Sequence, residues 1–99
     1  MSIMVMATLK LNDSNLLNEW KILSNWISGD LKGVDGFISR DSVQAKDGLI
    51  YCILKWESKE KQEAFTKNLE AREDFGKAMA EFSKIVDVTS MTKEFFTVL

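Results

Sequence analysis

The chain has 99 residues, enough for one hydrophobic core but not two, so we expect residues 1–99 to form a single domain. Its net charge is −2 and its lysines alternate with carboxylates, a pattern that argues against nucleic acid as a partner. Histidine is absent and cysteine occurs once, which excludes His-based catalytic triads, His-ligated zinc or haem, and thiolate zinc clusters.

The same composition predicts the compartment. The start of the chain lacks the basic and small-residue features of a secretory signal, and no apolar run is long enough to span a bilayer. The lone cysteine, Cys52, lies in an apolar run and fits a reducing environment. We therefore expect a cytoplasmic protein without a membrane partner.

The first half of the chain predicts a strand followed by a helix. Residues 2–11, "SIMVMATLKL", alternate with period two, and both faces begin apolar. Asn12 to Ser14 offer several N-caps for the helix that follows, and Gly29 and Gly33 are its stop signals. The apolar residues of this helix have helical spacing: Leu16, Leu17, Trp20, Leu23, Trp26, Ile27 and Leu31.

The second half predicts three strands and two helices. Residues 34–45 and 48–57 read as strands joined at "KDG", a short hairpin signal. Ser58 is a candidate cap for one helix, and Asp74 for the next. Residues 87–99 read as the closing strand. One side of the first of these helices carries Ala64, Phe65, Asn68 and Leu69. The apolar stripe of the second consists of Phe75, Ala78, Met79, Phe82, Ile85 and Val86.

The predicted order is β-α-β-β-α-α-β, an α+β plan with an antiparallel four-stranded sheet and helices on one face. The other face would carry Met4, Met6, Tyr51, Ile53 and either Phe95 or Phe96. That is too much apolar surface for a monomer to leave in water, so we expect a homodimer through the open sheet face.

Three segments carry a resemblance to a known family. "VDGF" after the first helix, "GLIYCILKW" ending in Trp56, and "ESKEKQEAF" opening the next helix resemble the antibiotic biosynthesis monooxygenase family. The resemblance covers nearly the whole chain and implies a ferredoxin-like fold assembled as a dimeric α+β barrel. It also implies a pocket between sheet and helices, and activities that range from cofactor-independent oxygenation of polyketides or quinols to haem breakdown.

The haem-degrading branch of the family uses an asparagine, a tryptophan and a histidine. Only the tryptophan carries over, onto Trp56, because the asparagine position falls near Ala7 and the histidine position near Met79 or Ala80. We therefore expect no haem, and no other cofactor or metal.

Trp56 has two readings, a packed aromatic that closes a strand or the wall of a pocket that stacks on a flat substrate. The apolar stripe of the two later helices likewise reads as core, but together with Trp56 it could line an apolar cavity. The polar candidates are Tyr51, Asn68, Arg72 and Asp35, and none is an evident general base, so the catalytic residues stay unknown. Trp20 and Trp26 read as core and interface anchors. The candidate substrate pocket is Trp56, Phe65, Leu69, Phe75, Met79 and Phe82.

These residues leave the function open between classes. One hypothesis is a cofactor-independent monooxygenase-like protein that acts on or binds a small aromatic or quinol-type molecule. In that reaction the deprotonated substrate itself would deliver an electron to O₂. The alternatives are a non-catalytic module that binds a small apolar ligand, and a structural dimer whose cavity is filled by side chains.

Overall fold

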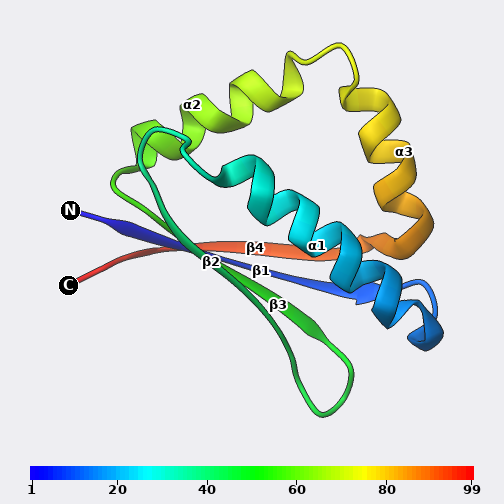
Figure 1. Ribbon diagram of the computed structural model, residues 1–99. Coiled ribbons are helices and arrows are strands. Elements are labelled where there is room, and N and C mark those ends of the chain that lie inside the picture. Colours follow the sequence, from blue (N-terminus) through cyan, green and yellow to red (C-terminus); the bar gives the residue numbers. More distant parts are fainter.

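A computed structural model describes all residues, 1–99. It contains four strands, three α-helices and one 3₁₀ turn (Figure 1). In chain order these are β1 (Ile3–Leu11), η1 (Ser14–Leu16), α1 (Leu17–Leu31), β2 (Phe37–Gln44), β3 (Ile50–Trp56), α2 (Lys59–Glu70), α3 (Phe75–Ile85) and β4 (Val86–Thr97).

The four strands form one antiparallel sheet in the order β2-β3-β1-β4. All three helices lie on the same side of this sheet, and both chain ends lie at one end of it (Figure 1). The predicted α+β, ferredoxin-like β-α-β-β-α-α-β order is confirmed. No helix is both long enough and apolar enough to cross a membrane.

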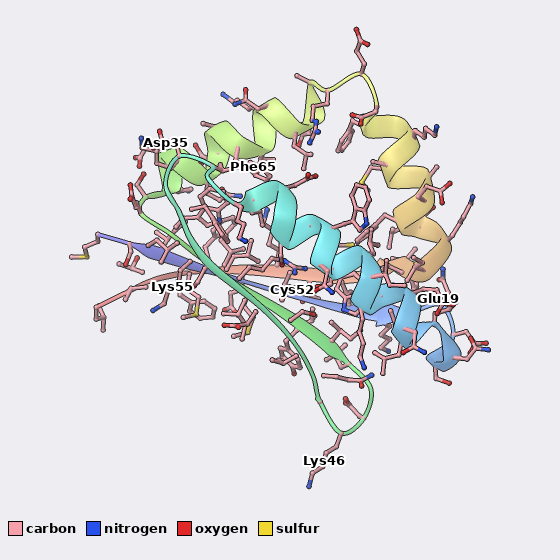
Figure 2. All side chains as sticks on the ribbon, viewed as in Figure 1. Glu19, Asp35, Lys46, Cys52, Lys55 and Phe65 are labelled. Atoms are coloured by element: carbon pink, nitrogen blue, oxygen red, sulfur yellow. The ribbon has the colours of Figure 1, made fainter.

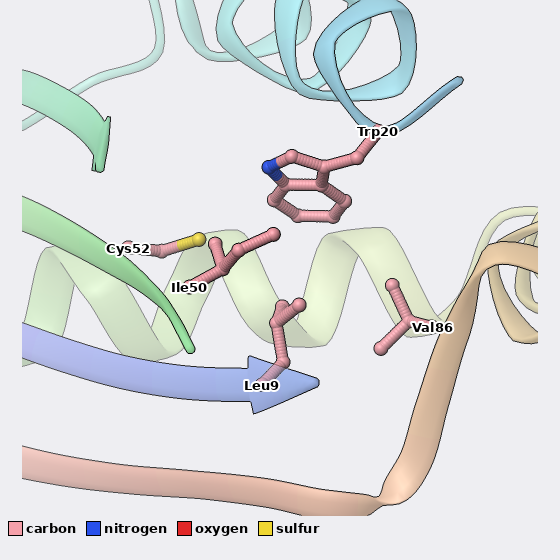
Figure 3. Close-up of a cluster of buried hydrophobic side chains, with 5 residues drawn as sticks. All are labelled: Leu9, Trp20, Ile50, Cys52 and Val86. Carbon is pink, nitrogen blue, oxygen red and sulfur yellow. The ribbon is translucent and has the colours of Figure 1, made fainter. Parts of the chain in front are cut away.

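Period-two alternation decides which side chains reach the helices. Val5 and Leu9 of β1 and Ile50, Cys52 and Trp56 of β3 are all buried on the helix side of the sheet. They divide into two clusters, one at each end of the sheet. The first core cluster, shown in Figure 3, joins five side chains from four elements: Leu9, Trp20, Ile50, Cys52 and Val86.

The open face of the sheet carries the apolar side chains expected there. Pairing of Met4 with Phe96, Met6 with Ile53 and Thr8 with Tyr51 places all of these residues on the side away from the helices. Lys55, from the same face, points away from the helices in Figure 2. The register thus selects Phe96 for this face and turns Phe95 to the helix side.

Two expected helix boundaries were wrong. Val86 does not end the apolar stripe of α3 but begins β4, where it is 1% exposed in the core. Gly29 does not stop α1, which continues to Leu31; Gly33, with φ +79°, follows the last turn instead. Asp13 caps only the 3₁₀ turn, accepting a hydrogen bond from the backbone N–H of Asn15 at 3.0 Å.

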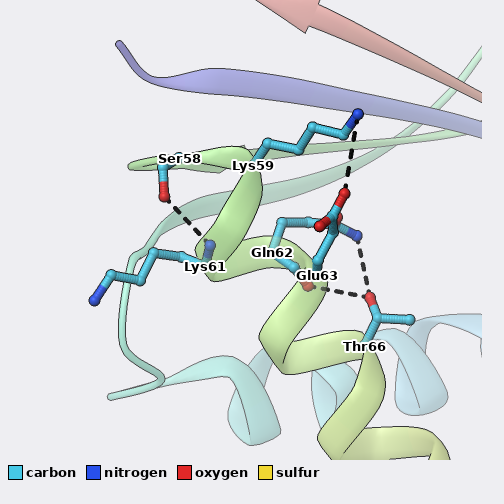
Figure 4. A network of polar contacts seen from close by, with 6 residues as sticks. All are labelled: Ser58, Lys59, Lys61, Gln62, Glu63 and Thr66. Atoms are coloured by element: carbon cyan, nitrogen blue, oxygen red, sulfur yellow. Dashed lines mark hydrogen bonds and ion pairs between the residues drawn. The ribbon is translucent and has the colours of Figure 1, made fainter.

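The hairpin and one helix cap follow the predicted chemistry. Gly48, in the β2–β3 turn, has φ +93°, a conformation that favours glycine. Ser58 caps α2, its Oγ accepting from the backbone N–H of Lys61 at 3.2 Å (Figure 4). Asp74 precedes α3 but makes no side-chain cap.

Candidate functional site

Trp56 ends β3 and forms the second core cluster with Val5 and Leu31. Its neighbours in the sheet are Ile3 of β1 and Phe37 of β2, so strands flank it on both sides. The indole is 2% exposed. It packs edge-on against Phe37 and at a tilt against Phe65 of α2, with ring centroids 5.5 Å apart in both pairs. Trp56 is therefore a core residue, enclosed by the neighbouring strands and by the rings of Phe37 and Phe65.

The rest of this cluster is aliphatic. Val5 and Leu31 are the other buried members. A half-buried layer packs on them, and it includes Ile27, Val34 and Leu54. No titratable side chain belongs to the cluster, so the groups around Trp56 can position and desolvate an aromatic molecule but cannot move a proton.

A hollow of about 420 Å³ lies between the end of α1 and α2, and Phe65 forms part of its wall. The ring of Phe65 thus touches Trp56 and also borders an open space. The volume falls in the range of small-molecule sites. The lining residues are Asp30, Val34, Asp35, Lys61, Ala64, Phe65, Asn68, Leu69 and Arg72.

This hollow gathers five residues that the sequence had singled out. Phe65 and Leu69 came from the expected pocket stripe, and Asp35, Asn68 and Arg72 from the polar candidates. Phe65, Asn68 and Leu69 belong to α2, whereas Asp35 lies in the loop after α1 and Arg72 lies just beyond the end of α2. An apolar wall with a few converging polar groups is the usual composition of a ligand site.

The ion pairs at this hollow are exposed. Lys61 pairs with Asp35, and the hydrogen bond and charge of Asp35 raise the pKa of Lys61 above its ordinary value. Arg72 lies 3.7 Å from Asp30 and 3.8 Å from Asp74. Exposed pairs of this kind contribute little stability, so both cations can exchange partners with a bound group at small cost.

The other expected pocket residues, Phe75, Met79 and Phe82, neither line this hollow nor belong to the cluster of Trp56. Phe82 of α3 packs edge-on against Trp20, with centroids 6.4 Å apart, beside the first core cluster. Phe75 is half-buried, and Met79 is 40% exposed. Of the three tryptophans, Trp20 is buried as expected, whereas Trp26 is 72% exposed on α1.

Gln62 is a buried polar residue that the sequence analysis missed. It is 7% exposed, and its Nε2–H donates to the Oγ1 of Thr66 at 3.1 Å (Figure 4). It lies one turn before Phe65 on the sheet-facing side of α2. The signal for its burial is helical spacing: Gln62 precedes Phe65 and Leu69 by three and seven residues, and so continues the apolar stripe by one turn.

Tyr51 does not belong to this region. Its partners across the sheet are Thr8 and Val43, which places it on the open face, as its parity with Trp56 predicts. Cys52 lies on the helix side beneath α1 (Figure 2), and burial raises the pKa of its thiol, an effect that the charge of Arg40 partly offsets.

Comparison with solved structures extends over the whole chain. SnoaB, a cofactor-independent oxygenase from Streptomyces nogalater, matches with a TM-score of 0.74 at 12% identity, over 99% of this chain and 93% of its own. A candidate antibiotic biosynthesis monooxygenase from Caulobacter crescentus CB15 matches with a TM-score of 0.78 at 16% identity, over 99% and 90%. One from Nitrosomonas europaea has a TM-score of 0.78 at 7% identity, over 99% and 90%.

This chain has the antibiotic biosynthesis monooxygenase fold. The resemblance carried by the three sequence segments is thereby confirmed for the fold. No protein-family model matches the sequence, and no curated protein matches it closely. At these identities the solved structures establish only the arrangement of helices and strands, and the chemistry must be argued from the side chains.

Proposed function

We propose that this chain is a cofactor-independent monooxygenase-like protein that binds, and acts on, a small aromatic or quinol-type molecule. The observation that carries the proposal is the position of Phe65, whose ring packs on Trp56 and borders the α1–α2 hollow. A rotation of this ring would connect the hollow to the indole. A flat ligand entering there would stack on Trp56 beneath α2.

In this proposal the pocket extends from the α1–α2 hollow toward the sheet. Trp56 and Phe65 form its inner wall and Leu69 its mouth, whereas the α3 residues Phe75, Met79 and Phe82 lie outside the hollow. Gln62 supplies a polar group in this wall. The amide oxygen of Gln62 has no hydrogen-bond donor in the protein, so it is free to accept from a ligand hydroxyl.

The reaction would draw its electrons from the substrate. A phenolate formed in the pocket gives one electron to O₂, and recombination of the two radicals forms a carbon–oxygen bond as a hydroperoxide. Loss of water from a CH–OOH group leaves a carbonyl, so one oxygen atom ends in the product and the other in water. The phenol proton leaves to solvent, one proton returns from solvent to the peroxide, and the protein contributes desolvation and orientation.

We also propose that the chain works as a cytoplasmic homodimer, with two open sheet faces packed together. The support is the cluster of Met4, Met6, Ile53 and Phe96 on a face that no helix covers.

Oxygen consumption with a panel of naphthohydroquinones and anthrahydroquinones tests the enzymatic proposal. We expect uptake above the autoxidation rate for at least one quinol, with loss in a folded Trp56→Phe variant and no loss in Trp26→Phe. Quinols that bind without uptake would overturn catalysis and leave the non-catalytic ligand-binding module. Binding can be read from thermal stability, since a ligand at 100 times its Kd adds ~2.7 kcal/mol. If no quinol stabilises the protein, the structural dimer replaces both.

A further inference from the structure

A second hollow, of about 530 Å³, lies between α1 and β2 and shares no lining residue with the α1–α2 hollow. Its walls combine aliphatic side chains and the indole of Trp20 with a row of hydroxyl and amide groups. Nothing in the proposed oxygenase chemistry uses it. Its lining residues include Trp20, Lys21, Ser24, Ser28, Arg40 and Ser42.

Arg40 is the centre of this hollow. β2 pairs Arg40 with Leu54, which turns the side chain toward the helices, and the residue is half-buried. Its Nη1 donates to the Oγ of Ser24 at 2.7 Å, to the backbone carbonyl of Ser24 at 3.1 Å, and to the Oγ of Ser28 at 2.9 Å. These bonds fix the guanidinium against α1 before any ligand arrives.

The charge of Arg40 has no counter-ion in the protein. Every acceptor around it is neutral, namely the hydroxyls and carbonyl on α1 and the thiol of Cys52, 3.8 Å from Nη2. No carboxylate comes within 4.0 Å, whereas the other arginine, Arg72, has two. A half-buried cation that gives up water without gaining a negative partner is costly, and a bound anion would remove that cost.

Part of the guanidinium is still free to bind. The Nε–H of Arg40 has no acceptor in the protein. Every buried side-chain nitrogen of the chain has a hydrogen-bond partner, so this unpartnered Nε is not buried but reaches solvent. A planar guanidinium edge with an open N–H matches a carboxylate better than it matches water.

The surroundings favour the same kind of ligand. Lys21, on α1, also lines the hollow and has no ion-pair partner. Asp41, the one acidic lining residue, pairs with Ile53 and so belongs by register to the open face of the sheet. The buried ring of Trp20 is anchored by a hydrogen bond from Nε1–H to the Oγ of Ser42, 3.1 Å. An apolar wall beside two cations suits an aromatic carboxylate.

We propose that the hollow between α1 and β2 is a binding site for a small aromatic carboxylate, held by the guanidinium of Arg40 and the ammonium of Lys21. This site is independent of the proposed oxygenase pocket, and its test needs no turnover.

The probe is benzoate, with benzamide as its neutral isostere, followed by nuclear magnetic resonance of the Arg40 Nε–H and the Trp20 indole N–H. Because the chain has two arginines, an Arg72→Gln variant assigns the Arg40 signal and serves as the matched control. We expect saturable shifts of both signals with benzoate and none with benzamide. Benzoate affinity should fall about tenfold in Arg40→Gln, severalfold in Lys21→Gln, and not at all in Arg72→Gln.

Equal shifts with benzoate and benzamide would overturn the proposal, as would an Arg40 signal that moves no more than that of Arg72. Inorganic phosphate that binds where benzoate does not would overturn the assignment to carboxylates. If Arg40→Gln fails to fold because α1 loses its contacts, Lys21→Gln decides the case: Lys21 is exposed, so its loss leaves the fold intact, and an unchanged benzoate affinity would contradict the site.

Discussion

At the scale of single residues, Gly36 shows how a glycine shapes the α1–α2 hollow. Gly36, in the loop that leads into β2, has φ +85° and is buried. A Cβ built there would collide with the side chain of Lys61, at the start of α2. Gly36 therefore lets the loop after α1 pack closely against α2, at one edge of the α1–α2 hollow. This is the physical content of the glycine in "VDGF".

We predict that Gly36→Ala destabilises the protein by more than ~1 kcal/mol, because it adds both backbone strain and a steric clash. Gly29→Ala is the matched control. Gly29 lies inside α1 with open space around its Cα, so alanine there should stabilise by about 0.5–1 kcal/mol. Urea unfolding measures both, and equal effects would contradict this account of Gly36.

The buried thiol of Cys52 makes stability depend on pH. Its pKa is raised in the folded protein, mainly by burial, so the folded state holds the thiol proton more tightly than the unfolded chain. This contribution is complete below the ordinary thiol pKa and is lost as the pH rises through the raised value. We predict that urea midpoints fall more steeply above the ordinary thiol pKa in the wild type than in Cys52→Ala. Parallel curves would contradict it.

At the scale of elements, the helices differ in how their ends are held. Ser58 caps α2 through a hydrogen bond to the third residue of the helix, whereas Asp74 makes no such bond at the start of α3. α2, the helix that positions Gln62 and Phe65, is therefore anchored at its first turn (Figure 4). α3 depends on its packing, through Phe82 and Ile85, against the first core cluster.

We predict that Ser58→Ala costs about 1 kcal/mol of unfolding free energy. Asp74→Ala should cost less than half of that, since it removes only an exposed ion pair with Arg72. Chemical denaturation of the two variants measures the difference. A larger loss in Asp74→Ala would mean that the start of α3 is held by a contact other than packing.

At the scale of the whole molecule, the sheet has one covered face and one open face. The helices bury the side chains at odd positions of β1, while Met4 and Met6 at even positions meet Phe96 and Ile53 on the other side. A second copy of the same face would cover these apolar side chains, and a stable dimer buries roughly 800 Å² per partner.

We predict a dimer in sedimentation at micromolar concentration and a monomer for Met6→Lys, because each copy would bury an unpaired lysine in the interface. Ile22→Lys is the control. Ile22 is 63% exposed on α1, on the helix side of the molecule, so this variant should remain dimeric. A wild-type monomer, or a dimer that survives Met6→Lys, would contradict the open-face interface.

Local patterns were enough to predict the element order, the hairpin at Gly48, the cap at Ser58 and the two faces of β1 and β3. Each depends on periodicity, turn chemistry or capping between residues close in the chain. Tertiary structure decided what depends on pairing across the sheet: Phe96 rather than Phe95 on the open face, and Val86 as the first residue of β4 rather than the last of α3. It also brought Arg40 to the hydroxyls of α1 and Phe65 to Trp56. Those contacts join residues 9 to 16 positions apart on elements that only folding places side by side, and no local pattern encodes them.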